Sequence, residues 1–287
     1  MLKSRLCIAF FAFAVGCAPA QKPLTDYVNP MLGTATLWDS VDLGFKPTKR
    51  TWGAEVFPGS SLPNAMVQVS PVTKFHSGAG YQYEDSVIYG FTHTNKGHWN
   101  LCHIPLLPVT GTPTPGDYCS PFSHERESAA PGYYQVFLDR YGVDAQLSST
   151  LRCAFHKYTY PAGAAASLLA DLQRSNEHVR AWDIRKEGDN VFAGWQQTGE
   201  KMYFYAVANR PVTGIEPVVE GDREVRIVRF GEGDGALELR IGFSFVSEKN
   251  ARENLEAEML GKSFAEVRSE ATATWNDLLG RIRVEGG

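Results

Sequence analysis

The chain has 287 residues, of which 43% are hydrophobic and 21% are charged, as in an ordinary globular protein. Its formal net charge is −4 and it contains no long basic run, so the composition argues against a nucleic-acid-binding protein. Aromatic residues make up 12% of the chain, which suits sugar stacking and a β-rich core equally well. The length accommodates one large domain or two small ones.

The N-terminal residues have the pattern of an export signal. Two basic residues precede an apolar stretch, Leu6–Val15, that is too short to span a bilayer. Ala18-Pro19-Ala20 then offers a small-residue cleavage site, which would make residues 1–20 a signal peptide. A second interpretation is a lipobox over Ala14–Cys17, in which Cys17 would carry a lipid. Both predict an exported protein, either periplasmic, extracellular or an outer-membrane lipoprotein, with membrane contact only through Cys17.

Three cysteines remain outside the signal region, at Cys102, Cys119 and Cys153. Their number is odd and they show no CxxC spacing. The pattern therefore argues against a disulfide framework and allows at most one pair with one free thiol.

Short segments of alternating apolar and polar residues, punctuated by Gly, Pro and Asn, run from Asp26 to about Glu248. Gly132–Leu138 and Val143–Thr150 are predicted to pair as a hairpin around a turn at residues 140–142. The other predicted strands are 65–69, 155–160, 167–171, 190–197, 202–208, 223–230 and 236–246. Strands at this spacing without helices between them predict an antiparallel β-sandwich or barrel rather than a parallel α/β fold.

The pattern changes near Ser247, after which apolar residues recur at spacings of three and four. This periodicity predicts amphipathic helices over residues 250–279, divided at Gly261. We therefore expect a β-sandwich domain over residues 26–249 and linker helices within residues 250–287. If the chain stands alone, the helical stripe lacks a later partner and should leave apolar surface exposed. That surface is expected around Phe264, Val267, Trp275 and Leu278.

The densest polar segment runs from His93 to His103 and contains three histidines at spacings of five. This spacing puts neighbouring side chains on opposite faces of a strand, so a zinc site is not favoured. The aromatic-rich loops around the segment predict either tight turns alone or a loop cluster that contacts a sugar. In the second case His98 and Trp99 are the candidate sugar contacts.

Glycoside hydrolysis requires two carboxyl groups across the scissile bond. The candidates by sequence are Glu55, Asp85, Glu125 and Glu127. No pair among them has a spacing that enforces the required geometry, so solvated charges or a loop salt bridge are favoured instead.

A series of ordered motifs resembles glycoside hydrolase family 92, the exo-acting α-mannosidases. The first is Tyr27–Thr34, which is similar to the family's opening VNPxIGT. The others, in chain order, are residues 57–59, 66–71, 80–81, 90–94, 122–125, 131–134, 137–138, 155–158, 245–247 and 275–279. Together they span essentially the whole mature chain.

The resemblance implies a mainly β fold, an antiparallel, galactose-mutarotase-like β-sandwich, which the family follows with an (α/α)6 barrel. This chain would then be the sandwich, the linker helices and the first residues of a barrel that is otherwise missing. The resemblance also implies calcium-dependent hydrolysis of terminal α-mannosyl linkages with inversion. The family carries its acid, base and calcium ligands on the barrel, so no catalytic or metal residue is assigned here. The chain alone is expected to be inactive.

The resemblance also implies that the sandwich contributes loops to the substrate pocket. The implied substrates are mannose-containing glycans of glycoproteins. By resemblance, the substrate-binding residues in this chain are His93, Asn95, His98, Trp99 and Trp52. The sequence departs from the family where Asn64-Ala65 replaces Phe-Gly and where Gly97–Asn100 replaces a Ser/Gly-rich loop. The second departure leaves the preferred linkage open. The alternatives are a stand-alone carbohydrate-binding module at the cell surface and a non-catalytic surface protein.

Overall fold

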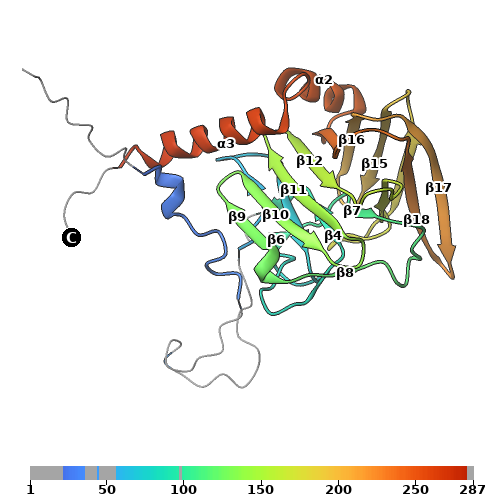
Figure 1. The fold of residues 1–287 in the computed structure, drawn as a ribbon, viewed down its shortest axis with the longest axis horizontal. Coiled ribbons are helices and arrows are strands. Elements are labelled where there is room, and N and C mark those ends of the chain that lie inside the picture. The colour runs from blue at the N-terminus through green and yellow to red at the C-terminus, as the bar shows by residue number, and fades with distance from the viewer. Residues whose placement is uncertain (1–21, 36–43, 45–55, 97–98, 283–287) are drawn as a thin grey trace, which may run out of the picture.

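A computed structural model describes residues 22–282, except residues 36–43, 45–55 and 97–98. Within this part, two antiparallel sheets face each other across one shared hydrophobic core (Figure 1). The seven-stranded sheet has the order β1 (Ser60–Ser61), β2 (Gln68–Val72), β4 (Gly90–Thr92), β7 (Leu106–Val109), β13 (Ser167–Ala170), β18 (Arg223–Phe230) and β17 (Val212–Glu220). The predicted antiparallel β-sandwich is confirmed.

The eight-stranded sheet has the order β14 (Ala181–Lys186), β15 (Val191–Gln197), β16 (Lys201–Ala208), β19 (Leu237–Ser244), β12 (Cys153–Thr159), β11 (Val143–Ser149), β10 (Tyr133–Leu138) and β9 (Glu127–Ala130). Two small ribbons, β3 (Val87–Ile88) with β8 (Ser120–Pro121) and β5 (Asn95–Lys96) with β6 (Trp99–Asn100), project from the loops. The short helices η1 (Leu24–Tyr27) and η2 (His124–Arg126) complete the β-rich part.

Alternating side chains explain why these segments form strands with one face in the core. Along β16, buried and half-buried positions alternate through the whole strand, which is the period of a pleated sheet. The predicted hairpin is also present, with Leu138 opposite Val143 at its closed end. Gly142, in that turn, has a φ of 65°, a conformation in which a side chain would be strained.

The predicted strand at residues 65–69 is wrong in its bounds, because β2 begins at Gln68. Asn64 has a φ of 58°, so the chain turns there, and the backbone N–H groups of Met66 and Val67 both bond to Leu151 O. The short strands β1 and β3 to β9 were not predicted, and among the strands of six residues or more neither were β14 and β17. Both have mostly half-buried or exposed side chains, and an edge strand of this kind carries little hydrophobic alternation.

The two C-terminal helices, α2 (Glu248–Glu258) and α3 (Phe264–Leu279), cover the outer face of the eight-stranded sheet (Figure 1). Gly242 on β19 permits the approach of α2, since a Cβ there would lie 2.1 Å from Ala251 O. Gly261, with a φ of 86°, separates the helices as predicted. Ser263 then begins α3 with a capping box to Glu266.

The prediction that the apolar stripe of the C-terminal helices would be exposed is wrong for Phe264 and Val267. Phe264 is 5% exposed and Val267 is 1% exposed, because α3 lies back on the sheet beside Tyr133 and Phe155. Trp275 is half-buried and its indole N–H donates to Ser61 O at 2.7 Å. The helices therefore find their partner in the sandwich itself, through outward-facing residues of β10 and β12.

The signal segment at residues 1–20 and Cys17 lie outside the described residues. Within residues 22–282 as described, no helix is both long and apolar enough to cross a membrane. Cys102, Cys119 and Cys153 are all free thiols.

Candidate functional site

The candidate site is centred on the β5–β6 ribbon, where Asn95 pairs with Asn100 and Lys96 with Trp99. Residues 97–98 lie outside the described residues. Trp99 is 37% exposed, whereas most large hydrophobic side chains of the sandwich are buried. A partly exposed indole on a polar ribbon presents a flat apolar face on which a sugar ring can stack.

Asn95 carries the second feature of the ribbon. The Oδ1 and Nδ2 atoms of its amide are both buried, and neither has a hydrogen-bond partner among the described residues. Buried polar groups in native proteins are almost always paired, so an amide with two unpaired ends needs an explanation. An incoming ligand with hydroxyl groups would satisfy both ends, since a hydroxyl donates and accepts.

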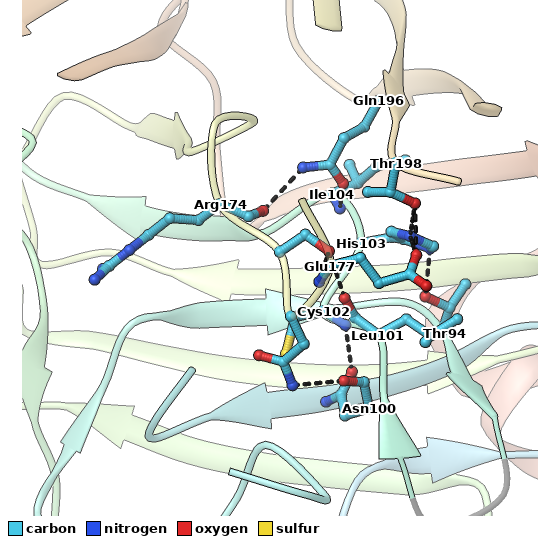
Figure 2. Close-up of polar contacts among 12 residues, drawn as sticks. Thr94, Asn100, Leu101, Cys102, His103, Ile104, Arg174, Glu177, Gln196 and Thr198 are labelled. Atoms are coloured by element: carbon cyan, nitrogen blue, oxygen red, sulfur yellow. Dashed lines mark hydrogen bonds and ion pairs between the residues drawn. The ribbon is translucent and has the colours of Figure 1, made fainter. Parts of the chain in front are cut away.

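Asn100 joins this ribbon to the segment that follows it (Figure 2). Its Oδ1 accepts the backbone N–H of Cys102 at 2.7 Å, and its amide also bonds to the Thr92 hydroxyl. Gly80 lies directly beside this amide, and a Cβ there would come within 2.6 Å of Asn100 Nδ2. The asparagine is therefore held from three sides and fixes the base of the ribbon.

The backbone after Asn100 is strained. Cys102 and Ile104 both have a φ of 53°, which is unusual for any side chain and an outlier for a β-branched one. Gln196 supports this stretch, since its Oε1 accepts Ile104 N at 2.8 Å and its Nε2 donates to Arg174 O (Figure 2). The same Nε2 also donates to Leu172 O. Strain of this kind persists only where the surroundings enforce it, and such positions cluster at functional sites.

His103 connects this strained segment to two distant parts of the chain (Figure 2). Thr198 Oγ1 donates to Glu177 Oε2 at 2.6 Å, so it accepts from His103 Nε2 at 3.0 Å. The other ring nitrogen, Nδ1, then accepts from Thr94 Oγ1 at 2.9 Å. Burial lowers the pKa of His103, although Glu177 opposes this effect, and the network agrees with a neutral ring.

Glu177 is the charged group of this cluster that reaches solvent, with a side chain 41% exposed. Its loop is tied to the strained segment by Ser175, which donates to Leu101 O at 2.6 Å, and by Asn176, which donates to Asn100 O at 2.6 Å. The cluster therefore consists of a rigid polar base, a half-exposed carboxylate and a ribbon bearing an indole and an unpaired amide.

The position of His93 argues against direct contact with a ligand. The residue is fully buried, its Nε2 lies 3.1 Å from His156 Nε2, and its ring packs on Phe243. Burial lowers the pKa of His93 to about 3, so the ring is neutral. It supports the candidate site from within the core rather than lining it.

The other predicted contacts divide into two groups. Asn95 and Trp99 lie together on the ribbon, whereas His98 and Trp52 lie outside the described residues. Within the described residues, no group of three or more His, Cys, Asp or Glu side chains could hold a metal ion. Sequence reasoning missed Glu177, Gln196 and Thr198, because nothing near them in the sequence marks them.

The candidate carboxylates of the sequence are placed as follows. Glu127 has a side chain only 1% exposed and binds the hydroxyls of Tyr81 and Tyr134 and a ring nitrogen of His124. It is therefore engaged in a buried polar network and is not a solvated charge. Asp85 accepts from the Thr73 hydroxyl, Glu125 is exposed, and Glu55 lies outside the described residues.

The fold and this cluster define a class of protein: a two-sheet antiparallel sandwich with a polar loop site, followed by two C-terminal helices. The chain belongs to glycosyl hydrolase family 92. The model of the family's N-terminal domain matches residues 27–254, and that of its catalytic domain matches residues 250–287.

Individual relatives agree with this assignment. A protein of Arthroderma benhamiae described as an uncharacterized secreted glycosidase is 24% identical over 314 residues, covering 91% of this chain. The family GH92 α-mannosidase BT3965 of Bacteroides thetaiotaomicron superposes with a TM-score of 0.80 at 26% identity, covering 93% of this chain. The inverting mannosidase BT2199 of the same organism, at 23% identity and a TM-score of 0.76, shows the same fold.

The chain spans only part of each relative. It covers 38% of the Arthroderma protein, 39% of BT3965 and 37% of BT2199.

Proposed function

We propose that this chain is the substrate-facing sandwich of an exported, calcium-dependent, inverting exo-α-mannosidase that acts on mannose-containing glycans of glycoproteins. The observation that carries the proposal is the β5–β6 ribbon, which combines the half-exposed indole of Trp99 with the unpaired buried amide of Asn95. The family match and the mannosidase neighbours support mannose as the sugar.

The ribbon suits recognition rather than bond cleavage. Trp99 would stack on the apolar face of a sugar ring, while the Asn95 amide would bond to ring hydroxyls. The network of His103, Thr198 and Glu177 would hold the ribbon at a fixed height above the sandwich, because each of its members is anchored on a different segment.

Inversion requires an acid and a base whose carboxyl groups are about 6.5–9.5 Å apart. Glu127, whose side chain is 1% exposed, is occupied by three hydrogen-bond partners within the sandwich. We therefore place the acid and the base in the catalytic domain of the whole enzyme and expect this chain to be inactive by itself.

Calcium is assigned in the same way. Ca²⁺ takes about six to eight oxygen ligands, and the described residues offer no group of three acidic or other metal-binding side chains. The described part of the chain therefore does not fit a calcium site. The proposal locates calcium in the catalytic domain.

A second candidate function is a stand-alone carbohydrate-binding module at the cell surface, with Cys17 as its lipid anchor. A module of this kind requires the C-terminal helices to fold back onto the sandwich. The burial of Phe264 and Val267 against Tyr133 and Phe155 favours it, because α3 then needs no later domain to cover these residues.

The test is mannosidase activity of the 287-residue chain on a chromogenic α-mannoside and on α-1,2-mannobiose, with and without calcium. The proposal expects no turnover but measurable, weak mannoside binding that Trp99→Ala weakens about tenfold. Calcium-dependent turnover would overturn the assignment of the catalytic carboxylates to another domain. Tight mannoside binding without turnover, in a chain with a stop codon after Gly287 and no neighbouring catalytic gene, would favour the binding module.

A further inference from the structure

A hollow of about 540 Å3 opens where β14, at the edge of the eight-stranded sheet, meets the end of the seven-stranded sheet. Among the described residues that line it are Gln173, Arg174, Arg180, Trp182 and Arg223, and none of those lining residues is acidic. This concentration of guanidinium groups stands out in a chain whose formal net charge is −4.

The hollow is separate from the candidate sugar site. Arg174 connects the two only through its backbone, since its carbonyl accepts from Gln196 while its side chain extends away from the cluster (Figure 2). The guanidinium of Arg174 lies 4.7 Å from the ring centre of Phe75 and 5.2 Å from that of Tyr89, and it donates to the Tyr118 hydroxyl. The two rings hold this cation in place at the wall of the hollow.

Arg223 is held from below by a buried carboxylate. Its Nη2 donates to Asp171 Oδ2 at 2.6 Å, and Asp171 is fully buried. The Nε atom of Arg223 is itself buried and has no partner among the described residues. Asp171 also receives the Tyr118 hydroxyl on the same oxygen, so its charge is already engaged.

The positive charge of the hollow is therefore only partly neutralised. Within the described residues, Arg223 forms an ion pair with Asp171, whose negative charge also acts on Arg174, while Arg180 forms no ion pair. Guanidinium groups that line one hollow repel one another, and an anion bound among them would relieve that repulsion. Arginine forks match the geometry of phosphate and carboxylate oxygens, to which they donate in pairs.

Two further groups of the hollow suit a sugar ring attached to the anion. The indole of Trp182 is half-buried and borders the hollow. The Oε1 atom of Gln173 accepts Glu224 N at 2.7 Å, which leaves the amide NH₂ group of Gln173 to donate to a ligand.

We propose that this hollow binds the phosphate or carboxylate group of an anionic saccharide, with Arg174 and Arg180 donating to the anion and Trp182 bordering the ring. The site lies apart from the β5–β6 ribbon and does not depend on the mannosidase assignment.

The test is calorimetric titration of the 287-residue chain with glucose 6-phosphate, glucuronate, glucose and inorganic phosphate at low ionic strength. The two charged sugars are expected to bind at least about tenfold more tightly than glucose, because the arginine side chains donate charge-assisted hydrogen bonds to the anion. Arg180→Gln is expected to weaken this binding about tenfold without lowering the melting temperature, since Arg180 is exposed.

The matched control is Lys186→Gln, which removes one exposed positive charge from β14 without touching the hollow. It should leave the affinities within about twofold, since exposed charges at a distance are screened by salt. An equal loss in both variants, or no binding of either charged sugar, would overturn the proposal. Inorganic phosphate binding as tightly as glucose 6-phosphate would overturn its saccharide part, because Trp182 would then contribute nothing.

Discussion

The Nε2 atoms of His93 and His156 lie 3.1 Å apart in the core, where neither residue is exposed. His93 Nδ1 lies 3.4 Å from His103 O and must donate to it, so His93 Nε2 accepts from His156. His156 Nδ1 then accepts from the Tyr158 hydroxyl at 2.5 Å. Each ring carries one proton, and a second would place an unpaired charge in the core.

This pair predicts a loss of stability in mild acid. Burial lowers the pKa of His93 to about 3, and burial together with His93 lowers the pKa of His156 well below its usual value. The unfolded chain therefore binds more protons below about pH 6.5, so the stability is complete above that pH and declines as the pH falls. The slope is about 1.4 kcal/mol per pH unit for each histidine.

Urea unfolding at about pH 7.5 and about pH 5 would measure this decline in the free energy of unfolding. His178 is exposed, so His178→Gln should reproduce the wild-type difference between the two pH values. His156→Leu, if it folds, should reduce that difference. A free energy of unfolding that is equal at both pH values would contradict the protonation states assigned to the pair.

Trp99→Ala is expected to weaken mannoside binding about tenfold, because stacking on an indole contributes about 0.5–1.5 kcal/mol beyond its buried area. The melting temperature should change little, since the side chain is 37% exposed. Ligand-observed NMR on methyl α-mannoside would measure the affinity. Tyr27→Ala is the control, as Tyr27 is 70% exposed on η1, and a comparable loss there would argue against the ribbon as the sugar site.

Gln196→Leu is expected to destabilise the protein by about 3 kcal/mol or more. The change leaves Ile104 N–H and two carbonyls, those of Leu172 and Arg174, without their partner in a buried setting, and each such group costs about 1–3 kcal/mol. Mannoside affinity should fall as well, because the strained segment below the ribbon loses its support. The neighbouring Gln197→Leu, measured by the same thermal and urea unfolding, should cost less than about 1 kcal/mol.

Phe264→Ala is expected to cost about 3–5 kcal/mol, since the ring is 5% exposed and packs edge-on against Phe155. Leu260→Ala, in the link between the helices, should cost less than about 0.5 kcal/mol because Leu260 is 50% exposed. Comparable losses in the two variants, or no loss in either, would mean that α3 does not pack on the sandwich in solution. Denaturant unfolding of both variants would decide the matter.

Several features of the fold follow from local sequence. The alternation in residues 132–138 and 143–150 predicts both strands of the hairpin, which the structure has at 133–138 and 143–149. The turn between them is predicted at residues 140–142, where Gly142 adopts the left-handed backbone conformation that glycine tolerates without strain. The edge strands β14 and β17 carry no such signal, since strands with mostly exposed faces need no hydrophobic alternation.

The candidate site shows the same division. Asn95 and Trp99 lie on one polar segment of the sequence. The ordered motifs along the whole chain identified the family. The sequence could not show that His93 faces the core, because the spacing of the three histidines is equally compatible with a loop or a strand.

What the sequence by itself determined is the set of local properties: the export-signal pattern, the strand periods, the helical stripe and the polar segment that contains Trp99. What only the tertiary structure decided is which distant residues meet. His103 and Thr198 are 95 positions apart yet bond at 3.0 Å, and Phe264 turns toward Phe155 rather than toward solvent. Contacts of this kind depend on how the two sheets and the helices pack, and packing is a property of the whole chain that no single segment encodes.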